Sequence, residues 1–251
     1  MRRWVSPLAV ILFWETVGRL NWVDPFFLPT PSRIMSAMLE MTLSGELFRH
    51  TGISLFRALS GYAIACVLGI GLGIAICRSR MMEDVFDPLV ELLRPVSTLG
   101  LIPLVILWMG IGNSSKIVVI VKACFFPVLL NTVAGLRGVN GKLIQAARSL
   151  GANELQLWKK AILPAALPMI VTGLRVSTAI SMLAIVGVEM MSADSGLGFL
   201  IVDAQRVFAT DRMFVGLIVM SALGFGMDYL ARKWEKRFLK WHIGPAAPSK
   251  F

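Results

Sequence analysis

Five charged residues interrupt or flank the long apolar segments of this sequence, and they are the first candidates for chemistry. They are Glu15, Lys122, Arg175, Glu189 and Asp228. A charge at the bilayer centre costs about 2.5–3.5 kcal/mol on insertion scales, so each one needs a counter-ion or a water-filled cavity. Arg175 and Glu189 stand nearly four helical turns apart and therefore project from similar faces of one helix. This spacing leaves two alternatives, a hydrophilic translocation pathway or ion pairs between helices.

Other chemistries lack the residues they need. The stretch "GIGLG" at 69–73 misses the last glycine of a dinucleotide-binding turn, and "GVNGKL" at 138–143 has the wrong spacing for a phosphate loop. The two histidines, His50 and His242, lie outside the apolar runs and form no HExxH zinc motif. We therefore expect no nucleotide, metal or cofactor site and no catalytic residue in this chain.

The composition points to a protein that lives in the bilayer. Of the 251 residues, 56% are hydrophobic and only 16% are charged, and the mean hydropathy is +0.73. Runs of about 20 apolar residues can cross a hydrocarbon core of about 30 Å. The sequence predicts a single all-α, polytopic domain over 1–251, with six spans near 5–20, 58–77, 96–111, 117–136, 165–188 and 213–230.

The net charge of +10 reflects membrane topology and does not indicate nucleic-acid binding. With the N-terminus inside, the larger share of lysine and arginine falls in the inner segments, and the outer loops mix basic residues with acids. Six spans then place both termini in the cytoplasm. The segment 137–164 also faces the cytoplasm in this topology.

Small residues recur every fourth position in the second predicted span, at Ala65, Gly69 and Gly73. This spacing lets two helix backbones approach closely in lipid, so we expect a tight helix contact along this face. Three cysteines lie scattered in apolar runs without paired spacing, and we expect them to be small core residues. They are Cys66, Cys77 and Cys124.

The stretch "LIQAARSLGANELQLWKKAILP", residues 143–164, is a polar, two-part helical segment between apolar runs. Leu143, Ala146 or Ala147, and Leu150 fall on one helical stripe. Gly151 can end that helix in a left-handed cap. The sequence thus predicts a short first helix with small residues on its face.

A second helix follows, because Asn153 is a good N-cap residue. Leu155, Trp158 and Ile162 are expected to form its apolar face, and Pro164 marks where the next span begins. Two short helices at an angle, projecting into the cytoplasm, would make a docking surface for another protein. A plain loop would need neither the apolar stripe nor an ordered turn.

These residues resemble the EAA loop of ABC importer permeases, which forms the coupling helix. Gln145-Ala146-Ala147, then Gly151, then Leu163-Pro164, hold the spacing of that loop. Gln145 stands in place of the usual glutamate and Ala161 in place of a common isoleucine. The resemblance implies that the residues coupling the chain to an ATPase are Gln145, Ala146, Ala147, Leu150, Gly151, Asn153, Leu163 and Pro164.

The rest of the chain is similar to permeases of the nitrate/sulfonate/taurine class, and most of all to aliphatic sulfonate permeases. The stretches that carry this similarity are "FFLPTPSRI", "RPVSTLGLIPLVILWMGIGNSSKI", "LPAALPMIVTGLR" and "SADSGLGFLI". Ser97 and Thr98 stand where prolines are frequent in that class. We therefore add them to Arg175 and Glu189 as predicted residues of the translocation pathway.

The resemblance implies a type I ABC importer permease in the cell inner membrane. Such a chain works as a homodimer in membrane lipid, with two cytoplasmic ATPase subunits that bind ATP and Mg, and with a periplasmic or lipid-anchored substrate-binding protein. The chain itself would then be a transport subunit and not an enzyme. An aliphatic sulfonate is the first expectation for the substrate, followed by taurine and nitrate.

One alternative from another class is an ion-coupled secondary transporter or a channel subunit. A secondary transporter would usually need more spans, broken helices at the membrane midplane and a deep ion-coupling acid. The sequence offers only Glu15 for that last role. An intramembrane enzyme lacks the catalytic pairs.

Overall fold

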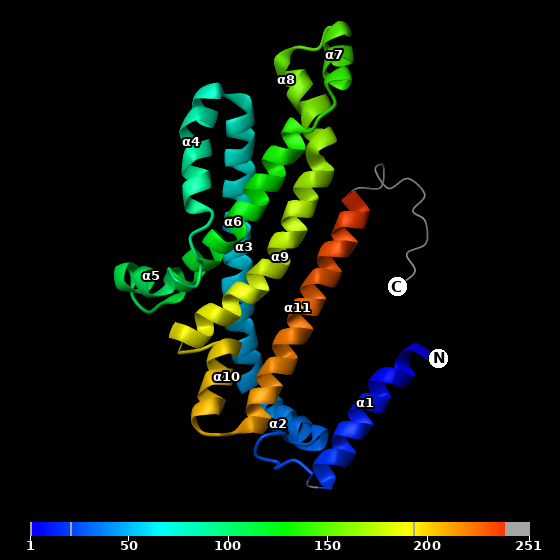
Figure 1. Cartoon of the computed structure of the whole chain (residues 1–251), viewed down its shortest axis with the longest axis vertical. Helices are drawn as coiled ribbons and strands as arrows, with labels where there is room; N and C mark the ends of the chain where they lie inside the picture. Colours follow the sequence, from blue (N-terminus) through cyan, green and yellow to red (C-terminus); the bar gives the residue numbers. More distant parts are fainter. Residues whose placement is uncertain (1, 21, 193, 239–251) are drawn as a thin grey trace. The chain divides into compact units, whose positions relative to one another are not determined.

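The computed structural model describes residues 2–20, 22–192 and 194–238, and the regular structure of these residues is entirely helical (Figure 1). The predicted all-α class is confirmed. In chain order the helices are α1 (Arg2–Arg19), α2 (Pro31–Leu43), α3 (Glu46–Arg78), α4 (Arg80–Leu93), α5 (Ile102–Met109), α6 (Asn113–Arg137), α7 (Gly141–Ser149), α8 (Glu154–Leu157), a π-helical turn (Trp158–Ile162), α9 (Leu163–Ser192), α10 (Leu197–Arg206) and α11 (Thr210–Phe238). The predicted cytoplasmic C-terminal end, residues 239–251, lies outside the described residues.

Among the described residues, four helical stretches are long and apolar enough to cross a membrane. These stretches are Glu46–Arg78, Asn113–Arg137, Glu154–Ser192 and Thr210–Arg237. Each one contains a predicted span, and each is longer than predicted because its ends continue as helix beyond the apolar run. The six-span topology as a whole stays a prediction.

The two remaining predicted spans differ from each other. Residues 5–20 fall on α1, a helix of 18 residues. Residues 96–111 contain only α5, whose eight residues extend about 12 Å and cannot cross a core of about 30 Å. Pro95 lacks an N–H and follows the end of α4, and a turn then separates α4 from α5. The helix over this segment is therefore shorter than the hydropathy predicted.

The chain divides into two compact units. Unit 1 comprises residues 1–57 and 185–223, and unit 2 comprises residues 58–184 and 224–251.

Within unit 2, α3 and α6 pack closely along the predicted small-residue face. Ala65 is completely buried. A Cβ atom added at Gly69 would lie 2.9 Å from Cγ1 of Val128, and one added at Gly73 would lie 2.7 Å from Cγ2 of Thr132. Any larger side chain would force the two helices apart, so the predicted tight helix contact is confirmed.

Hydrogen bonds join α9 to α6 and α3 in the same unit. The Ser177 hydroxyl donates to the carbonyl of Cys124 over 3.1 Å, and the Tyr62 hydroxyl donates to the carbonyl of Leu174 over 3.2 Å. Cys124 is buried, and all three cysteines are free thiols, in agreement with their predicted role as small packing residues.

Within unit 1, aromatic and ionic contacts hold α1, α2 and the start of α11. Trp14 and Phe214 have ring centroids 5.7 Å apart. Glu15 forms an ion pair with Arg19 over 2.7 Å and accepts the backbone N–H of Ser32 over 3.1 Å. The carboxylate of Glu15 is thus held by local partners on α1 and α2.

Candidate functional site

The segment after α6 folds into the two short helices α7 and α8, which extend beyond the end of α6 and the start of α9 (Figure 1). The side chain of Asn140 caps α7 by accepting the backbone N–H of Lys142 over 2.9 Å. This bond satisfies one of the donors that the first turn of a helix leaves free. The start of α7 is therefore fixed by a local hydrogen bond.

A left-handed turn at Gly151 ends α7. The φ angle of Gly151 is +79°. The N–H of Ala152 donates to the carbonyl of Ala147 over 3.1 Å, and the N–H of Gly151 donates to the carbonyl of Arg148 over 2.9 Å. These two bonds form a Schellman motif, which favours glycine at the left-handed position. The predicted glycine cap is confirmed.

The predicted N-cap of α8 is also confirmed. The side chain of Asn153 accepts the N–H of Gln156 over 2.8 Å, and the side chain of Gln156 accepts the N–H of Asn153 over 3.1 Å. This reciprocal pair is a capping box. Across the turn, Arg148 and Glu154 form an ion pair of 3.1 Å. Because both termini of the turn are hydrogen-bonded, the angle between α7 and α8 is well defined.

The apolar face of the second helix differs from the prediction. Leu157 and Ile162 are buried, whereas Leu155 is 54% exposed. The turn Trp158–Ile162 is π-helical, so its residues advance around the axis by a smaller angle than in an α-helix. Leu157 and Ile162 pack in a cluster with Leu136 and Ala166. This cluster fixes α7 and α8 to the ends of α6 and α9.

The two helices also carry an open, largely apolar hollow of about 370 Å³ beside this cluster, and Ala147 and Ala161 border both. Leu150 is 88% exposed and Leu143 is 43% exposed. The residues that line the hollow are Leu143, Ala146, Ala147, Leu150, Ala152, Gln156, Lys160 and Ala161. This hollow is the exposed apolar surface on which the predicted docking role depends.

The structure thus brings five of the eight predicted coupling residues to α7 and its C-terminal turn. Gln145 lies exposed on α7 beside Ala146 and does not line the hollow. Leu163 and Pro164 are the first two residues of α9, which continues directly from the π-helical turn Trp158–Ile162. These two residues begin the span that carries Arg175.

Arg175 forms ion pairs with α11 inside unit 2. Its Nη1 lies 3.0 Å from Oε2 of Glu235, and its Nε lies 3.6 Å from Oδ1 of Asp228. The side chain is 36% exposed and lines a largely apolar cavity of about 460 Å³ among α3, α9 and α11. The positive charge of Arg175 is therefore balanced by two carboxylates.

Glu189 belongs to a different network, in unit 1. It is 1% exposed, and its Oε1 lies 2.9 Å from Nη1 of Arg57. The carboxylate also accepts the hydroxyl of Ser54 over 2.7 Å and the N–H of Gly198 over 3.0 Å. Separating a buried pair of this kind typically costs about 3–5 kcal/mol, because it leaves one charge unpaired.

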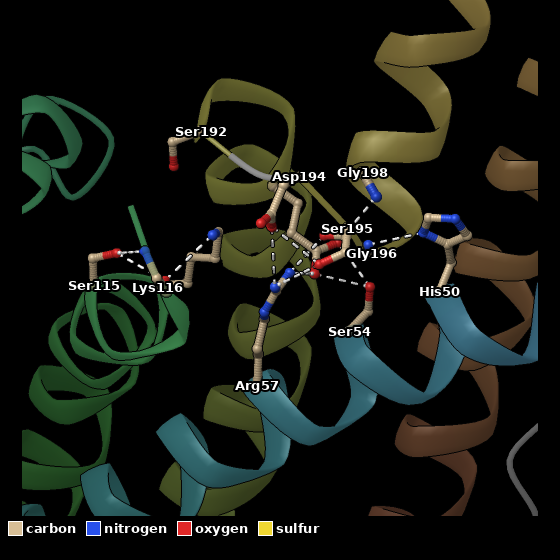
Figure 2. A network of polar contacts seen from close by, with 12 residues as sticks. His50, Ser54, Arg57, Ser115, Lys116, Ser192, Asp194, Ser195, Gly196 and Gly198 are labelled. Carbon is tan, nitrogen blue, oxygen red and sulfur yellow. Dashed lines mark hydrogen bonds and ion pairs between the residues drawn. The ribbon is translucent and has the colours of Figure 1, made fainter. Parts of the chain in front are cut away.

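The same network holds the loop before α10 against α3 (Figure 2). Arg57 donates to the carbonyl of Ser195 over 2.6 Å, and Nδ1 of His50 accepts the N–H of Gly196 over 3.0 Å. Gly196 has a φ angle of +112°, and a Cβ there would lie 2.2 Å from Oε1 of Glu189. Only glycine fits this position. Side chains of α3 therefore form hydrogen bonds with the backbone of a loop that lies more than 130 residues away in sequence.

Sequence reasoning missed Arg57 because the predicted span began one residue after it. The signal that could have found it is the spacing of His50, Ser54 and Arg57, which places three polar side chains on one face of a helix. Arg175 and Glu189 have different partners in the structure. Their predicted place on a shared pathway stays a prediction.

Ser97 and Thr98 lie in the turn between α4 and α5. Ser97 accepts the N–H of Gly100 through its hydroxyl over 3.2 Å, so it stabilises the turn. Thr98 accepts a hydrogen bond of 3.1 Å from Nζ of Lys122 on α6, and Lys122 also donates to the carbonyl of Val96. A cavity of about 360 Å³ lies beside Lys122.

The four long apolar helical stretches among the described residues place the chain in the class of helical membrane proteins. Residues 65–240 match the family described as "Binding-protein-dependent transport system inner membrane component". The chain belongs to this family of ABC transporter permeases. It is a multi-pass inner-membrane transport subunit and not an enzyme, and ATP is bound by partner ATPase subunits.

Two curated relatives are similar over almost the whole chain. A protein of Bacillus subtilis (strain 168) named as an aliphatic sulfonates transport permease, SsuC, is 40% identical over 96% of this chain and 87% of its own length. The taurine transport system permease protein TauC of Escherichia coli (strain K12) is 36% identical over 95% of this chain and 89% of its own length. The predicted membership of an ABC importer permease class is confirmed.

A solved structure supports the fold. The chain resembles one described as an amino acid ABC transporter with histidines, with a TM-score of 0.64 and 20% identity over 80% of this chain and 96% of the other. At this identity the similarity concerns the fold alone. Membership of the binding-protein-dependent family implies two kinds of partner, an ATPase and a substrate-binding protein.

Proposed function

We propose that two copies of this chain form the translocation pathway of an importer for a small organic anion, with an aliphatic sulfonate as the first candidate. Taurine and nitrate are the next candidates. The observation that carries the proposal is the whole-length similarity to SsuC and TauC. The solute reaches the pathway from an external binding protein, and both termini of each chain lie in the cytoplasm.

The docking surface on α7 and α8 gives this proposal its mechanism. The hollow around Ala147 and Leu150 receives the ATPase, and the buried cluster around Leu157 and Ile162 ties the two helices to α6 and α9. When the ATPases close on Mg-ATP, they move the docked helices, and the ends of α6 and α9 follow because packed cores deform little. ATP hydrolysis then returns the pathway to its resting state.

The docking role can be tested by co-purification. Ala147→Asp places an unpaired charge in the apolar hollow, and we expect the permease to lose its ATPase. Ser149→Asp adds the same charge at an exposed position of α7 that does not line the hollow, and this matched control should keep the ATPase. Equal recovery of ATPase with both variants would contradict the proposed docking surface.

Four residues are proposed to line or shape the pathway: Arg175, Glu189, Ser97 and Thr98. Arg175 is proposed for this role because it lines a cavity of about 460 Å³, and Thr98 because it contacts Lys122. Glu189 would shape the pathway indirectly, because its carboxylate holds the start of α10. An ion-coupled secondary transporter would need a carboxylate free to take up and release a coupling ion. Glu15, Glu189 and Asp228 are instead each paired with an arginine, which favours the ATP-driven importer.

The substrate and the oligomeric state need a reconstituted system. The permease is purified with its ATPase and placed in liposomes with its substrate-binding protein. Uptake of radiolabelled ethanesulfonate, taurine and nitrate is then measured with and without ATP. We expect ATP-dependent uptake of a sulfonate and two permease chains per complex by native mass spectrometry. Uptake of none of these anions would refute the proposed substrate class, and one permease chain per complex would refute the homodimer.

A further inference from the structure

Lys122 differs from Arg57 and Arg175 in the chemical type of its hydrogen-bond partners. Both arginines bond to carboxylates. Lys122 bonds to a backbone carbonyl and a hydroxyl, and the described residues place no carboxylate within ion-pair distance of it. A charged residue in an apolar helix is rare in itself and by default indicates a functional site.

Because α6 is long and apolar enough to cross a membrane, we expect Lys122 to lie inside the hydrocarbon region. It is the tenth of 25 residues of the helix, so its backbone lies about 14 Å from the start of the helix. The whole helix extends about 37 Å, longer than a core of about 30 Å. Lipid headgroups do not reach this depth, so an anion that meets Lys122 comes from a water-filled route through the protein.

The cavity beside Lys122 is positively charged and walled by both polar and apolar groups. It has a volume of about 360 Å³ and is lined by Arg94, Thr98, Lys122, Phe126 and four apolar or backbone neighbours, with no aspartate or glutamate among them. The ammonium lies 5.9 Å from the ring centroid of Phe126. Two cations without an acid produce a field that attracts an anion.

The hydrogen-bonding capacity of these groups is only partly used. An ammonium has three N–H donors, and Val96 and Thr98 receive two of those of Lys122. The hydroxyl of Thr98 accepts from Lys122 and keeps its own O–H for donation. One N–H of Lys122 and the O–H of Thr98 can therefore reach two oxygens of one ligand, and Arg94 offers a planar guanidinium to a third.

We propose that Lys122, Thr98 and Arg94 form an oxyanion site inside the membrane domain, which binds the anionic headgroup of the transported solute. A sulfonate has three oxygens around one sulfur and matches the three donors. This inference rests on the proposed function for the identity of the solute. The charge and geometry of the site require only a small oxyanion.

The turn between α4 and α5 explains how a polar binding site can exist inside the membrane domain. Irregular backbone in the membrane is tolerated where it lines a cavity. Pro95 and Ser97 shape this turn, which presents the carbonyl of Val96 and the hydroxyl of Thr98 to Lys122. The segment that fell short of a full span thus supplies one of the three site residues, Thr98, and the carbonyl of Val96 that holds Lys122.

The test uses the complete importer in liposomes, and it compares variants that remove a donor with variants that keep it. Lys122→Met and Thr98→Val remove the charge and the hydroxyl at similar volume, whereas Lys122→Arg and Thr98→Ser keep them. Lys233→Met removes an exposed lysine of α11 and serves as the control. We expect uptake of ethanesulfonate to fall at least tenfold in the first two variants and less than threefold in the other three.

A second measurement separates a binding role from a structural one. Equilibrium dialysis of radiolabelled ethanesulfonate and nitrate against the permease–ATPase complex, without binding protein, should detect weak binding that Lys122→Met abolishes. The complex should still assemble with its ATPase. Unchanged binding and uptake in Lys122→Met would overturn the site, as would a joint loss of uptake and assembly, which would make Lys122 only a link between α6 and the turn.

The same measurement distinguishes failure of the site from failure of the proposed substrate. If the parental importer takes up no sulfonate but nitrate binds in a Lys122-dependent way, the oxyanion site stands and the sulfonate assignment fails. If Lys122→Met imports ethanesulfonate at the parental rate, the sulfonate assignment stands and the site fails.

Discussion

Gly151 provides the sharpest test of the docking surface, because its role depends on one backbone angle. Its φ angle is +79°, and a Cβ added there would meet no heavy atom within 4 Å. A substitution at Gly151 therefore introduces no clash, and its whole effect comes from the backbone conformation. An L-residue in the left-handed region costs about 1–2 kcal/mol, and a β-branched one costs more.

This cost sets the expected size of the effect. Since about 1.4 kcal/mol corresponds to a factor of ten, Gly151→Ala should lower the population of the correct turn roughly 5- to 30-fold relative to its alternatives. Asparagine tolerates the left-handed region better than alanine, and valine tolerates it least. We therefore expect ATPase binding and uptake to decrease in the order Gly151, Gly151→Asn, Gly151→Ala, Gly151→Val.

The assay combines capture of the ATPase by the tagged permease with ATP-dependent uptake in liposomes. All variants should insert in the membrane normally, because Gly151 lies outside the long apolar helices. Gly141, at the start of α7, also has open space around it and no positive φ, so Gly141→Val is the matched control and should lose little. Normal uptake by Gly151→Val, or equal damage by Gly141→Val, would refute the reasoning.

Three further predictions concern the ion pairs and the topology. Arg175→Leu leaves Glu235 without its ion-pair partner, whereas Asp228 keeps Arg232. We therefore expect lower uptake and a lower Tm of the solubilised protein, and Glu235→Gln added to this variant should recover part of the Tm. Recovery of uptake as well would mean that Arg175 has only a structural role. Glu189→Gln removes the buried counter-ion of Arg57, which then keeps Asp194 at 4.0 Å. The variant should lower stability by up to about 3–5 kcal/mol in thermal melts, and an unchanged Tm would mean that the pair contributes no net stability. Single cysteines are placed at Ser44 and Ser149 in a chain without its own cysteines. A thiol reagent should label Ser44→Cys from the outside and Ser149→Cys from the cytoplasmic side. Labelling of both from the same side would contradict the predicted topology.

The docking helices could be predicted in detail because their signals are local. Asn153 and Gln156 cap one helix with each other. The turn at Gly151 ends the other helix through the bonds from Gly151 to Arg148 and from Ala152 to Ala147, which span three and five residues. Such interactions depend on residue type and short spacing alone. Leu155 was misplaced because a π-helical turn, which no residue type announces, changes the angular register after Leu157.

The ion-pair partners could not be predicted, since they depend on contacts between distant segments. Glu189 and Arg57 are 132 residues apart, and nothing near either residue identifies the other. The predicted length of the helix over 96–111 was also wrong, because the interruption depends on a single residue and the turn after it. Hydropathy averages over the whole run and gives no weight to the single missing N–H of Pro95 or to the turn that follows it.

The charges in the apolar helices show why a charge by itself does not identify a pathway. The cost of burying a charge must be met by some partner, and the kind of partner determines what the residue can do. Arg57 bonds to a carboxylate that also accepts a hydroxyl and a backbone N–H, so its capacity is used inside the protein. Lys122 bonds to neutral oxygens, keeps its net charge and borders an open cavity. A passing anion can lower the electrostatic energy at Lys122 but would have to displace a carboxylate at Arg57. The counter-ion, and not the depth of the charge in the membrane, therefore separates a residue that holds the fold from one that can bind the transported solute.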